Sequence, residues 1–419
     1  MANITQQAQT AQNRAADGGA DARRMLAEYG ANPLHFFALL PDKRYLLSEP
    51  GGPEWGVAYR VVGRQALALG DPFGDSAAVP DAIARFAALC RRQGWKPVWY
   101  QTTGANLDTY RRAGLQVVKV GEDAQISLTD FSLAGKKYVK MRNDLRRIEK
   151  AGVILEAYGP DCPPNAECTA EMNAISQGWR KAHNAGEGWF AMGGFDPNCR
   201  LFAESRYFVA RDTGTGRMLA FTSFVPIFGA GGVQGWTLDL MRRQADALHG
   251  VMDFLIVSAA TQFAAEGAQT LSLGLSPLAG DDDPTEAAAT SHIRRFLYTR
   301  LNRAYNFQGL HTFKAKFATY WDPRYLVYPG HLALASASGA VLKAHLTPPT
   351  SPKPKQWHVR SSQHRGFVLC ALLLIGLAPF EKTLAKRAAA HPAHWSHLRS
   401  LSYAHLNLHH FKFHRSARV

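Results

Sequence analysis

The chain lacks most of the sequence features that point directly to a well-known chemistry. Its five cysteines are widely spaced and include no CxxC pair, which argues against a zinc site or a dithiol and fits a reducing, cytosolic environment. It contains no GxxxxGK[ST] phosphate loop, no GxGxxG after a predicted strand, no HExxH and no GxSxG. These absences count against nucleotide hydrolysis, nicotinamide binding and serine-hydrolase chemistry.

Long apolar runs are also scarce. Residues 1–29 are polar and have no apolar core of the kind a signal peptide needs, so we expect a disordered leader. The apolar stretch GFVLCALLLIGLAPF, at residues 366–380, has 15 residues, short of the roughly 20 that cross a bilayer. We expect an interfacial or protein-packed segment there, with a membrane span as the alternative.

Positive charge is abundant, with a formal net charge of +15. From residue 339 onward the chain holds 12 of its 48 lysines and arginines, a single acidic residue and ten of its 16 histidines. Histidine-rich tracts can bind metal, but these histidines have no fixed ligand spacing. The composition therefore favours a basic tail over residues 339–419, with a metal site as the alternative.

A second basic concentration lies at residues 135–152. Tyr138, Met141, Leu145 and Ile148 recur at steps of three and four, which predicts a helix with these residues facing inward. The remaining faces carry cations that we expect to contact phosphates of a nucleic acid or of lipid headgroups, the alternative being an ordinary solvated face. These cations are Lys136, Lys137, Lys140, Arg142, Arg146, Arg147 and Lys150.

Strand-like and helix-like stretches follow one another in an order that repeats. Each half of the chain has short strands joined by turns, then a helix, then another strand. The order predicts a tandem α/β protein with mixed sheets. We place one unit at residues 30–160 and a second, carrying the active site, at residues 161–338.

Eight short motifs follow one another along the chain: LGDPFGD, WYQTTG, GEDAQISL, FSLAGKKYVKMRN, WRKAHNAGEGWFAMGGF, TLDLMRR, LSLGLSPLAG and GLHTFKAKFATYWDPRYLVYP. Together, in this order, they give a resemblance to a known family, the phosphatidylglycerol lysyltransferases or aminoacyl-phosphatidylglycerol synthases. The body of the chain resembles the catalytic domain of that family. The resemblance implies two fused domains of the acetyltransferase (GNAT) type.

The resemblance also implies an activity, the transfer of lysine or alanine from aminoacyl-tRNA to phosphatidylglycerol. Because the ester on the tRNA is already activated, no metal and no cofactor besides aminoacyl-tRNA is expected. A less anionic membrane lipid and resistance to cationic antimicrobial peptides would follow. We expect a cytoplasmic protein on the inner face of the membrane. Family members often carry a multi-span membrane domain; without one, this chain would work with a separate flippase, and its basic tail would bind anionic lipid.

In the motif TLDLMRR the resemblance marks Asp239 and Arg242 as catalytic. Asp239 would hold the aminoacyl ammonium group or accept a proton, and Arg242 would bind a phosphate through its planar fork. The alternative is structural, either an Asp–Arg ion pair or a helix cap, because the sequence predicts a strand-to-helix junction where an aspartate caps well. On either interpretation, Leu248, Met252 and Leu255 form the core stripe of the helix.

Further site residues come from neighbouring motifs. Lys314 and Lys316, in FKAKF, are expected on one face of a strand, where either would serve as a catalytic cation, with a solvated edge as the alternative. Glu187 lies in a glycine-rich loop where a carboxylate can face a ligand, the alternative being an ordinary surface acid. Tyr100 and Glu122 match family positions and are assigned to substrate binding, with a core position and a turn as the respective alternatives. Ser276, in LGLSPLAG, is assigned to the substrate site as part of a turn that shapes it; without a nearby histidine it is not expected to act as a nucleophile.

Two other functions remain open on the sequence. One is a GNAT-type N-acyltransferase acting on a peptide or small amine, although no [QR]xxGx[GA] pyrophosphate loop lies in a convincing position. The other is a non-catalytic protein that binds a membrane surface or RNA.

Overall fold

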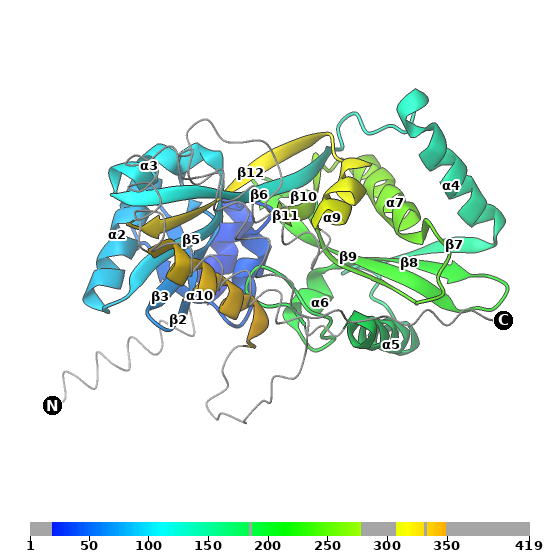
Figure 1. Ribbon diagram of the computed structural model, residues 1–419, viewed down its shortest axis with the longest axis horizontal. Helices are drawn as coiled ribbons and strands as arrows, with labels where there is room; N and C mark the ends of the chain where they lie inside the picture. Colours follow the sequence, from blue (N-terminus) through cyan, green and yellow to red (C-terminus); the bar gives the residue numbers. More distant parts are fainter. Residues whose placement is uncertain (1–18, 184–186, 278–306, 331–332, 349–419) are drawn as a thin grey trace, which may run out of the picture.

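The structure is a computed structural model that describes residues 19–183, 187–277, 307–330 and 333–348. Within these residues the strands form one sheet of 12 strands in the order β1-β2-β3-β5-β12-β6-β11-β10-β9-β8-β7, with β4 paired to β2 (Figure 1). The strands are β1 Arg44–Leu47, β2 Trp55–Val62, β3 Gln65–Leu69, β4 Phe73–Gly74, β5 Lys96–Thr102, β6 Leu115–Ser127, β7 Val153–Tyr158, β8 Arg206–Asp212, β9 Met218–Gly229, β10 Gly232–Arg243, β11 Thr270–Pro277 and β12 Tyr320–Pro329. The predicted α/β class with a mixed sheet is confirmed.

The helices lie on both faces of this sheet (Figure 1). The α-helices are α2 Val79–Arg92, α3 Leu107–Arg112, α4 Val139–Lys150, α5 Ala166–His183, α6 Arg200–Glu204, α7 Val251–Ala265, α9 Phe307–Ala315 and α10 Leu334–Leu346. The short 3-10 helices are η1 His35–Leu39, η2 Ser76–Ala78, η3 Gly104–Asn106 and η4 Lys136–Tyr138.

The predicted repeat is visible in the strand pairing. In the first half, β1, β2 and β3 form an antiparallel meander, and after α2 the chain returns as β5, parallel to β3. In the second half, β7 to β10 form the meander, and after α7 the chain returns as β11, parallel to β10. The β3–β5 and β10–β11 pairs are the parallel pairs of the described sheet.

Two strands join the halves into one sheet. β12 pairs with β5 on one side and β6 on the other, and β6 pairs in turn with β11. Figure 1 shows β6 and β12 running together across the middle of the molecule. Strand β7 pairs with β8, so the second meander begins before residue 160. The division into two units stays a prediction.

Alternation along the strands explains how the second half packs on both faces. On β8, Phe208 and Ala210 belong to the core beneath α7, whereas Tyr207 and Val209 belong to the core beneath α5. Successive strand residues point to opposite faces, so a strand buried on both sides reads as continuously apolar. In Figure 1, α7 and α5 accordingly lie on opposite sides of β8 and β9.

The ordered chain extends beyond the predicted unit boundaries at both ends. Residues 19–29, predicted to belong to a disordered leader, form a helix, because Ala22, Met25 and Leu26 are buried against Phe73 and its neighbours. At the other end, α10 continues past the predicted start of the basic tail at residue 339 because its alanines pack against the sheet.

The apolar stretch at residues 366–380 lies outside the described residues, as does most of the tail. Among the helices that the structure describes, none is both long and apolar enough to cross a membrane.

The aromatic core of the second half gives a stability prediction. Phe263 is fully buried, with its ring centroid 4.8 Å from that of Trp236 and 5.3 Å from those of Phe208 and Phe224. We expect Phe263→Ala to lower the free energy of unfolding by about 3–5 kcal/mol, measured by urea denaturation. Leu248 is the control: it was predicted to lie in the core stripe, but it precedes α7 and is 41% exposed. Leu248→Ala should change stability by less than about 0.5 kcal/mol, and equal losses in both variants would contradict this packing.

Candidate functional site

Asp239 and Arg242 lie inside strand β10, not at the start of a helix. The strand runs to Arg243, and α7 begins only at Val251. The alternative in which Asp239 caps the helix is therefore wrong, and a purely structural Asp–Arg pair stays open. The pairing of β10 with β9 shifts between Leu238 and Leu240, which makes Asp239 the extra residue of a β-bulge.

The bulge brings Asp239 and Arg242 to the same face of the sheet. Trp236 and Leu238 pack in the core beneath α7, but Leu240 packs in the core beneath α5, so the alternation changes between them. On a regular strand, residues three apart point to opposite faces. The extra residue of the bulge shifts the alternation by one position, so that Asp239 and Arg242 point to the same face. Bulges recur beside active sites because they re-aim side chains in this way.

The segment 187–195 lies against the bulge. The Gly193 N–H donates to Asp239 Oδ1 at 2.8 Å. A Cβ atom on Gly193 would stand 2.4 Å from Asp239 Oδ2, and one on Gly194 would stand 3.1 Å from Glu187 Cβ. Glycine is therefore required at Gly193 for the backbone to approach the carboxylate this closely.

Helix α5 supplies the other wall of the site. The guanidinium carbon of Arg242 lies 3.9 Å from the centre of the Trp179 ring, which is a cation–π contact. Glu187 lies between two arginines, with Oε2 3.7 Å from Arg242 Nη2 and Oε1 3.1 Å from Arg180 Nε. The cluster thus contains two acidic groups, Asp239 and Glu187, and two basic groups, Arg180 and Arg242.

Burial sets the ionisation of this cluster. It raises the pKa of Asp239 to about 6, although the Gly193 N–H and the charge of Arg242 both oppose the shift. Burial also lowers the pKa of Arg242, against the attraction of Glu187 and Asp239; an arginine remains charged nonetheless. Asp239 thus changes its charge just below neutral pH, the range in which a general base works best.

Several polar atoms of the cluster are buried without a hydrogen bond among the described residues. They are both carboxylate oxygens of Glu187 and the Nε atoms of Arg180 and Arg242. Buried polar groups are normally satisfied. Attraction between opposite charges holds these groups in place.

Lys314 lies where the parallel pairing of β10 and β11 ends. The two strands pair from Gly235 and Thr270 only as far as Thr237 and Ser272. Asp239 follows on β10, and on β11 the carbonyls of Gly274 and Leu275 accept hydrogen bonds from Lys314 Nζ at 2.8 and 2.9 Å. Burial lowers the pKa of Lys314 to about 8.

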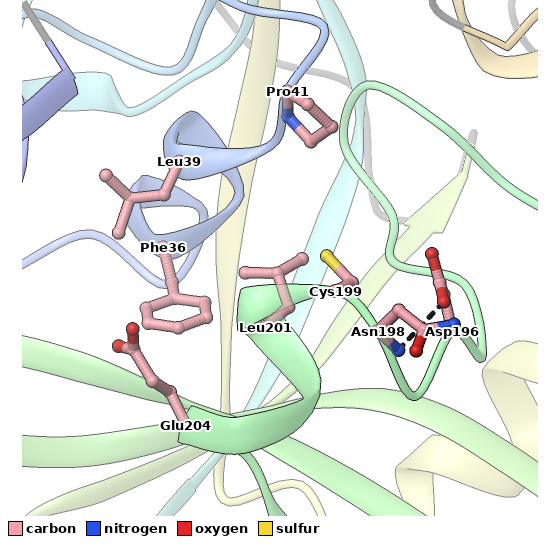
Figure 2. A pocket seen from close by; sticks show the side chains of 8 residues that line it. All are labelled: Phe36, Leu39, Pro41, Asp196, Asn198, Cys199, Leu201 and Glu204. Carbon is pink, nitrogen blue, oxygen red and sulfur yellow. Dashed lines mark hydrogen bonds between the residues drawn. The ribbon is translucent and has the colours of Figure 1, made fainter.

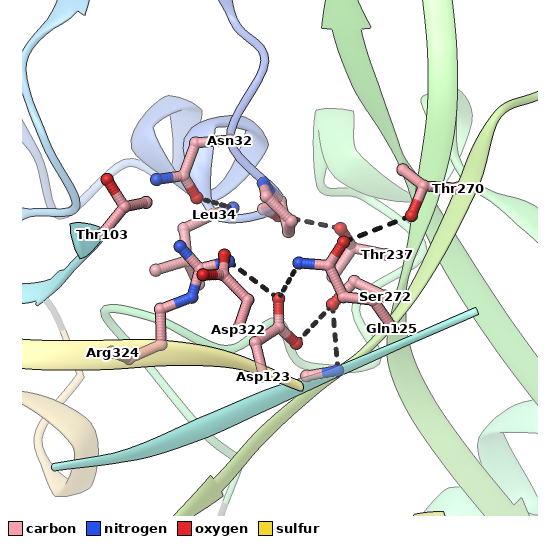
Figure 3. Close-up of polar contacts among 12 residues, drawn as sticks. Asn32, Leu34, Thr103, Asp123, Gln125, Thr237, Thr270, Ser272, Asp322 and Arg324 are labelled. Atoms are coloured by element: carbon pink, nitrogen blue, oxygen red, sulfur yellow. Dashed lines mark hydrogen bonds and ion pairs between the residues drawn. The ribbon is translucent and has the colours of Figure 1, made fainter. Parts of the chain in front are cut away.

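A buried polar network supports this end of β11 (Figure 3). Arg324 Nη2 lies 2.9 Å from a carboxylate oxygen of both Asp123 and Asp322. Asp123 Oδ1 accepts from Ser272 Oγ at 2.7 Å, and that hydroxyl in turn accepts from the Gly274 N–H at 3.0 Å. The network therefore fixes the backbone of Gly274, whose carbonyl holds Lys314.

The two lysines of FKAKF do not share a face, contrary to the prediction. The motif lies at the end of helix α9, not on a strand, because Phe313 and Phe317 are spaced for one face of a helical turn and pack into the core together. Lys316 consequently points to α7, where its Nζ lies 2.7 Å from Asp253 Oδ2, and its side chain is 42% exposed. The structure thus separates Lys316 from Lys314.

The predicted substrate-binding residues are dispersed. Glu187 joins the cluster around Asp239 and Arg242. Tyr100 packs with its ring stacked on that of Phe190, at 6.1 Å between centroids, so it contacts the 187–195 segment. Glu122 accepts from Lys119 Nζ at 2.8 Å, and its strand partner in the register of β6 and β11 is Ser276, which is fully buried. Their roles in binding stay predictions.

Helix α4 has the predicted inward face, with Met141 and Ile148 buried and Tyr138 and Leu145 half-buried. Its cations differ in their surroundings. Arg142 donates to backbone carbonyls of Leu133 and Gly135, and Arg147 to that of His249. The other five are exposed: Lys136, Lys137, Lys140, Arg146 and Lys150.

A cavity of about 350 Å³ lies elsewhere, between η1 and α6 (Figure 2). Its walls are largely apolar, with two carboxylates: Phe36, Leu39, Pro41, Asp196, Asn198, Cys199, Leu201 and Glu204. Glu204 is engaged by Arg23 at 2.6 Å. None of the site residues predicted from the sequence lines this cavity.

Sequence reasoning missed four residues that shape the site. Trp179 and Arg180 open the motif WRKAHNAGEGWFAMGGF, so the signal was present, but an aromatic and a cation on a predicted helix look like ordinary core and surface. Asp123 and Arg324 also lie in matched motifs, about 200 residues apart. Only the pairing of β6 with β12 brings them together.

Two repeats of a meander, a helix and a parallel strand, with a polar site where the parallel pairing ends, define a mixed α/β protein with an internal repeat. Residues 23–328 match the family described as phosphatidylglycerol lysyltransferase, C-terminal. The chain belongs to this family.

Individual relatives agree with this assignment. The phosphatidylglycerol lysyltransferase of Bacillus subtilis (strain 168) is 28% identical over 320 residues, covering 75% of this chain and 36% of that protein. The C-terminal domain of a putative lysylphosphatidylglycerol synthetase from Agrobacterium fabrum is 29% identical with a TM-score of 0.64, covering 78% of this chain and 96% of that one. L-PGS from Bacillus licheniformis is 25% identical with a TM-score of 0.65, covering 78% and 97%. The chain spans about a third of the length of the curated relatives it matches.

The buried network around Arg324 predicts a contrast in stability. Arg324 is 1% exposed and pairs with two carboxylates, so Arg324→Met should leave buried charges uncompensated and cost about 3–5 kcal/mol in urea denaturation. Lys316→Met removes an ion pair that is partly exposed, and should cost less than about 1 kcal/mol. A loss of under 1 kcal/mol for Arg324→Met would show that the network does not hold the centre of the sheet together.

Proposed function

We propose that the protein transfers an aminoacyl group, lysine or alanine, from aminoacyl-tRNA to a hydroxyl of phosphatidylglycerol. Membership of the family and the names of its relatives support this reaction class. The observation that carries the proposal is the bulge of β10, which places the family-matched Asp239 and Arg242 on one face with Glu187.

The reaction requires a proton acceptor and an anion-binding group close together. The lipid hydroxyl oxygen forms a bond to the ester carbonyl carbon, and the bond from that carbon to the tRNA ribose oxygen breaks. Asp239, ionised above its pKa of about 6, takes the hydroxyl proton and returns it to the departing ribose oxygen. In the alternative role, Asp239 holds the ammonium group of the aminoacyl moiety.

The cations of the site would bind the phosphate and the developing negative charge. The Arg242 guanidinium stacks on Trp179, which holds its plane in one orientation, and a planar fork can bind a phosphate bidentately. Lys314, fixed by two carbonyls, supplies a second cation across the end of the β10–β11 pairing and would stabilise the oxyanion of the transition state.

The partners follow from this chemistry. The exposed cations of α4 would contact tRNA phosphates or lipid headgroups. The acceptor lipid would be reached at the inner face of the membrane, and a separate flippase would move the product across. Replacing an anionic headgroup by an aminoacylated one would make the membrane less anionic and protect the cell against cationic peptides.

A reconstituted reaction tests the proposal. Purified protein is incubated with phosphatidylglycerol vesicles, tRNA, aminoacyl-tRNA synthetases and labelled lysine or alanine, and the lipids are separated. We expect label in a phosphatidylglycerol product, with a rate that falls as pH drops through about 6, because the protonated Asp239 carboxyl can no longer accept a proton. Asp239→Asn should lower the rate at least about a hundredfold at pH 7.

Two results would contradict the proposal. An absence of labelled lipid with tRNA verified as charged would reject the reaction. A folded Asp239→Asn variant with full activity would reject the role of Asp239, and would leave its carboxylate a structural group.

A pair of glycine variants isolates the contact between the 187–195 segment and the bulge. A Cβ atom on Gly193 would collide with the Asp239 carboxylate, whereas one on Gly178, in α5, meets nothing within 4 Å. We expect Gly193→Ala to lower the rate of lipid labelling at least about tenfold, since a displacement of about 1 Å at a reacting group has effects of this size or larger. Gly178→Ala should keep full activity and gain about 0.5–1 kcal/mol of stability. Equal activity of the two variants would show that the contact is dispensable.

A further inference from the structure

A buried lysine from the first half of the chain contacts the segment that builds the site in the second half. Lys43 immediately precedes β1, and its side chain is 0% exposed. Its Nζ donates to Asp42 Oδ1 at 2.5 Å and to the carbonyl oxygen of Phe190 at 2.8 Å. The same nitrogen lies 4.9 Å from the centre of the Phe190 ring.

Phe190 has a backbone conformation that its neighbours must hold in place. Its φ is 70°, in the left-handed region that favours glycine, and it is completely buried. A non-glycine residue keeps such a conformation only where the surroundings over-determine it. Here the ring packs against Tyr100 and His345, at 6.1 and 5.7 Å between centroids, and Lys43 binds the carbonyl oxygen.

The position of Phe190 links this contact to the site. It lies three residues after Glu187, which pairs with Arg242 and Arg180, and three before Gly193, whose N–H reaches Asp239. A shift of the Phe190 carbonyl would therefore displace the Gly193 donor, the Glu187 carboxylate or both.

Arg60 shares the same buried carboxylate but contacts a different part of the molecule. Its Nη1 lies 3.2 Å from Asp42 Oδ2, and its other bonds go to the end of α10 and the residues after it, namely the carbonyls of Ala344, Thr347 and Pro348 and the hydroxyl of Thr347. Among the described residues, the two cations that share the Asp42 carboxylate therefore bind different parts of the chain. Lys43 binds the 187–195 segment, and Arg60 binds the chain around the end of α10.

We propose that Lys43 is a positioning residue for the transfer site, holding the 187–195 segment so that Gly193 reaches Asp239 and Glu187 reaches Arg242. Its effect on catalysis rests on the function proposed above. Its effect on the segment does not, because that effect can be measured without any substrate.

Hydrogen exchange provides the measurement that is independent of activity. The full-length Lys43→Met and Arg60→Met variants are compared with the unchanged protein by exchange and mass spectrometry of peptides covering residues 187–195. Losing a hydrogen bond to a charged donor should make this segment exchange about ten- to a hundredfold faster in Lys43→Met. Arg60→Met should loosen the end of α10 and reach the segment only through the ring contact of His345 with Phe190, so that its exchange stays within about threefold. Equal acceleration in both variants, or none in either, would overturn the proposal.

The pH profile of lipid labelling tests the consequence for Asp239. The ionisable groups that act on this carboxyl are Arg242 and Glu187, and it in turn faces Tyr207. Lys43→Met leaves Arg242 and Tyr207 in place, but it should weaken the Gly193 hydrogen bond, which lowers the pKa of Asp239, and displace Glu187, whose charge raises that pKa. The Gly193 hydrogen bond has the larger influence of the two. We therefore expect the midpoint of the profile to move to higher pH in Lys43→Met and not in Arg60→Met. An unmoved midpoint together with unchanged exchange would assign Lys43 to stability alone.

The outcomes separate the two proposals. If the unchanged protein labels no lipid, the proposed function fails, and the exchange data still decide whether Lys43 holds the segment. If Lys43→Met does not fold, Lys43→Gln replaces it, because Asp42 keeps Arg60 as its partner, and Arg60→Gln serves as the control. Faster exchange at residues 187–195 in Lys43→Gln only supports the proposal, and equal exchange in both contradicts it.

Discussion

The bulge at Asp239 is the constraint on which the site depends. If β10 were a regular strand without the bulge, Asp239 and Arg242 would point to opposite faces of the sheet, one towards α7 and the other towards α5. With it, both meet the groups on the α5 side, Trp179 and Glu187 among them. The rest of the local structure maintains this arrangement, since Gly193 permits the close approach and the 187–195 segment supplies the donor.

Much of the fold could be predicted because the spacing of apolar residues along the chain indicates which faces of helices and strands are buried. The meanders, the helices between them and the inward face of α4 all follow from apolar spacing. The prediction of a strand for FKAKF was wrong because Phe313 and Phe317 flank two lysines at alternate positions, and this pattern also fits one turn of a helix. Short segments of this kind are ambiguous until a neighbour, here the core beneath α7, selects one conformation.

The candidate site was predictable in part. The resemblance pointed to Asp239, Arg242 and Glu187, which the structure brings together. The bulge had no signal, because no glycine or proline marks Leu238 to Leu240. Lys43 had none either, since its function depends on a contact with Phe190, 147 residues further along the chain. Contacts between distant segments depend on sheet topology, which local spacing does not encode.

The pairing of β12 between β5 and β6 sets the order in which the protein can be made. β12 spans Tyr320–Pro329, whereas its partners lie some 200 residues earlier. During synthesis the first half emerges before β12, so the edge of β5 that receives β12 is still unpaired, as is β6, and such exposed edges favour aggregation. Arg324, which completes the buried network supporting the carbonyl bound by Lys314, arrives on the same strand. This network is therefore completed last, so that a chain released before β12 would contain Asp239 and Arg242 without Arg324 and without the strand that joins the two halves of the sheet.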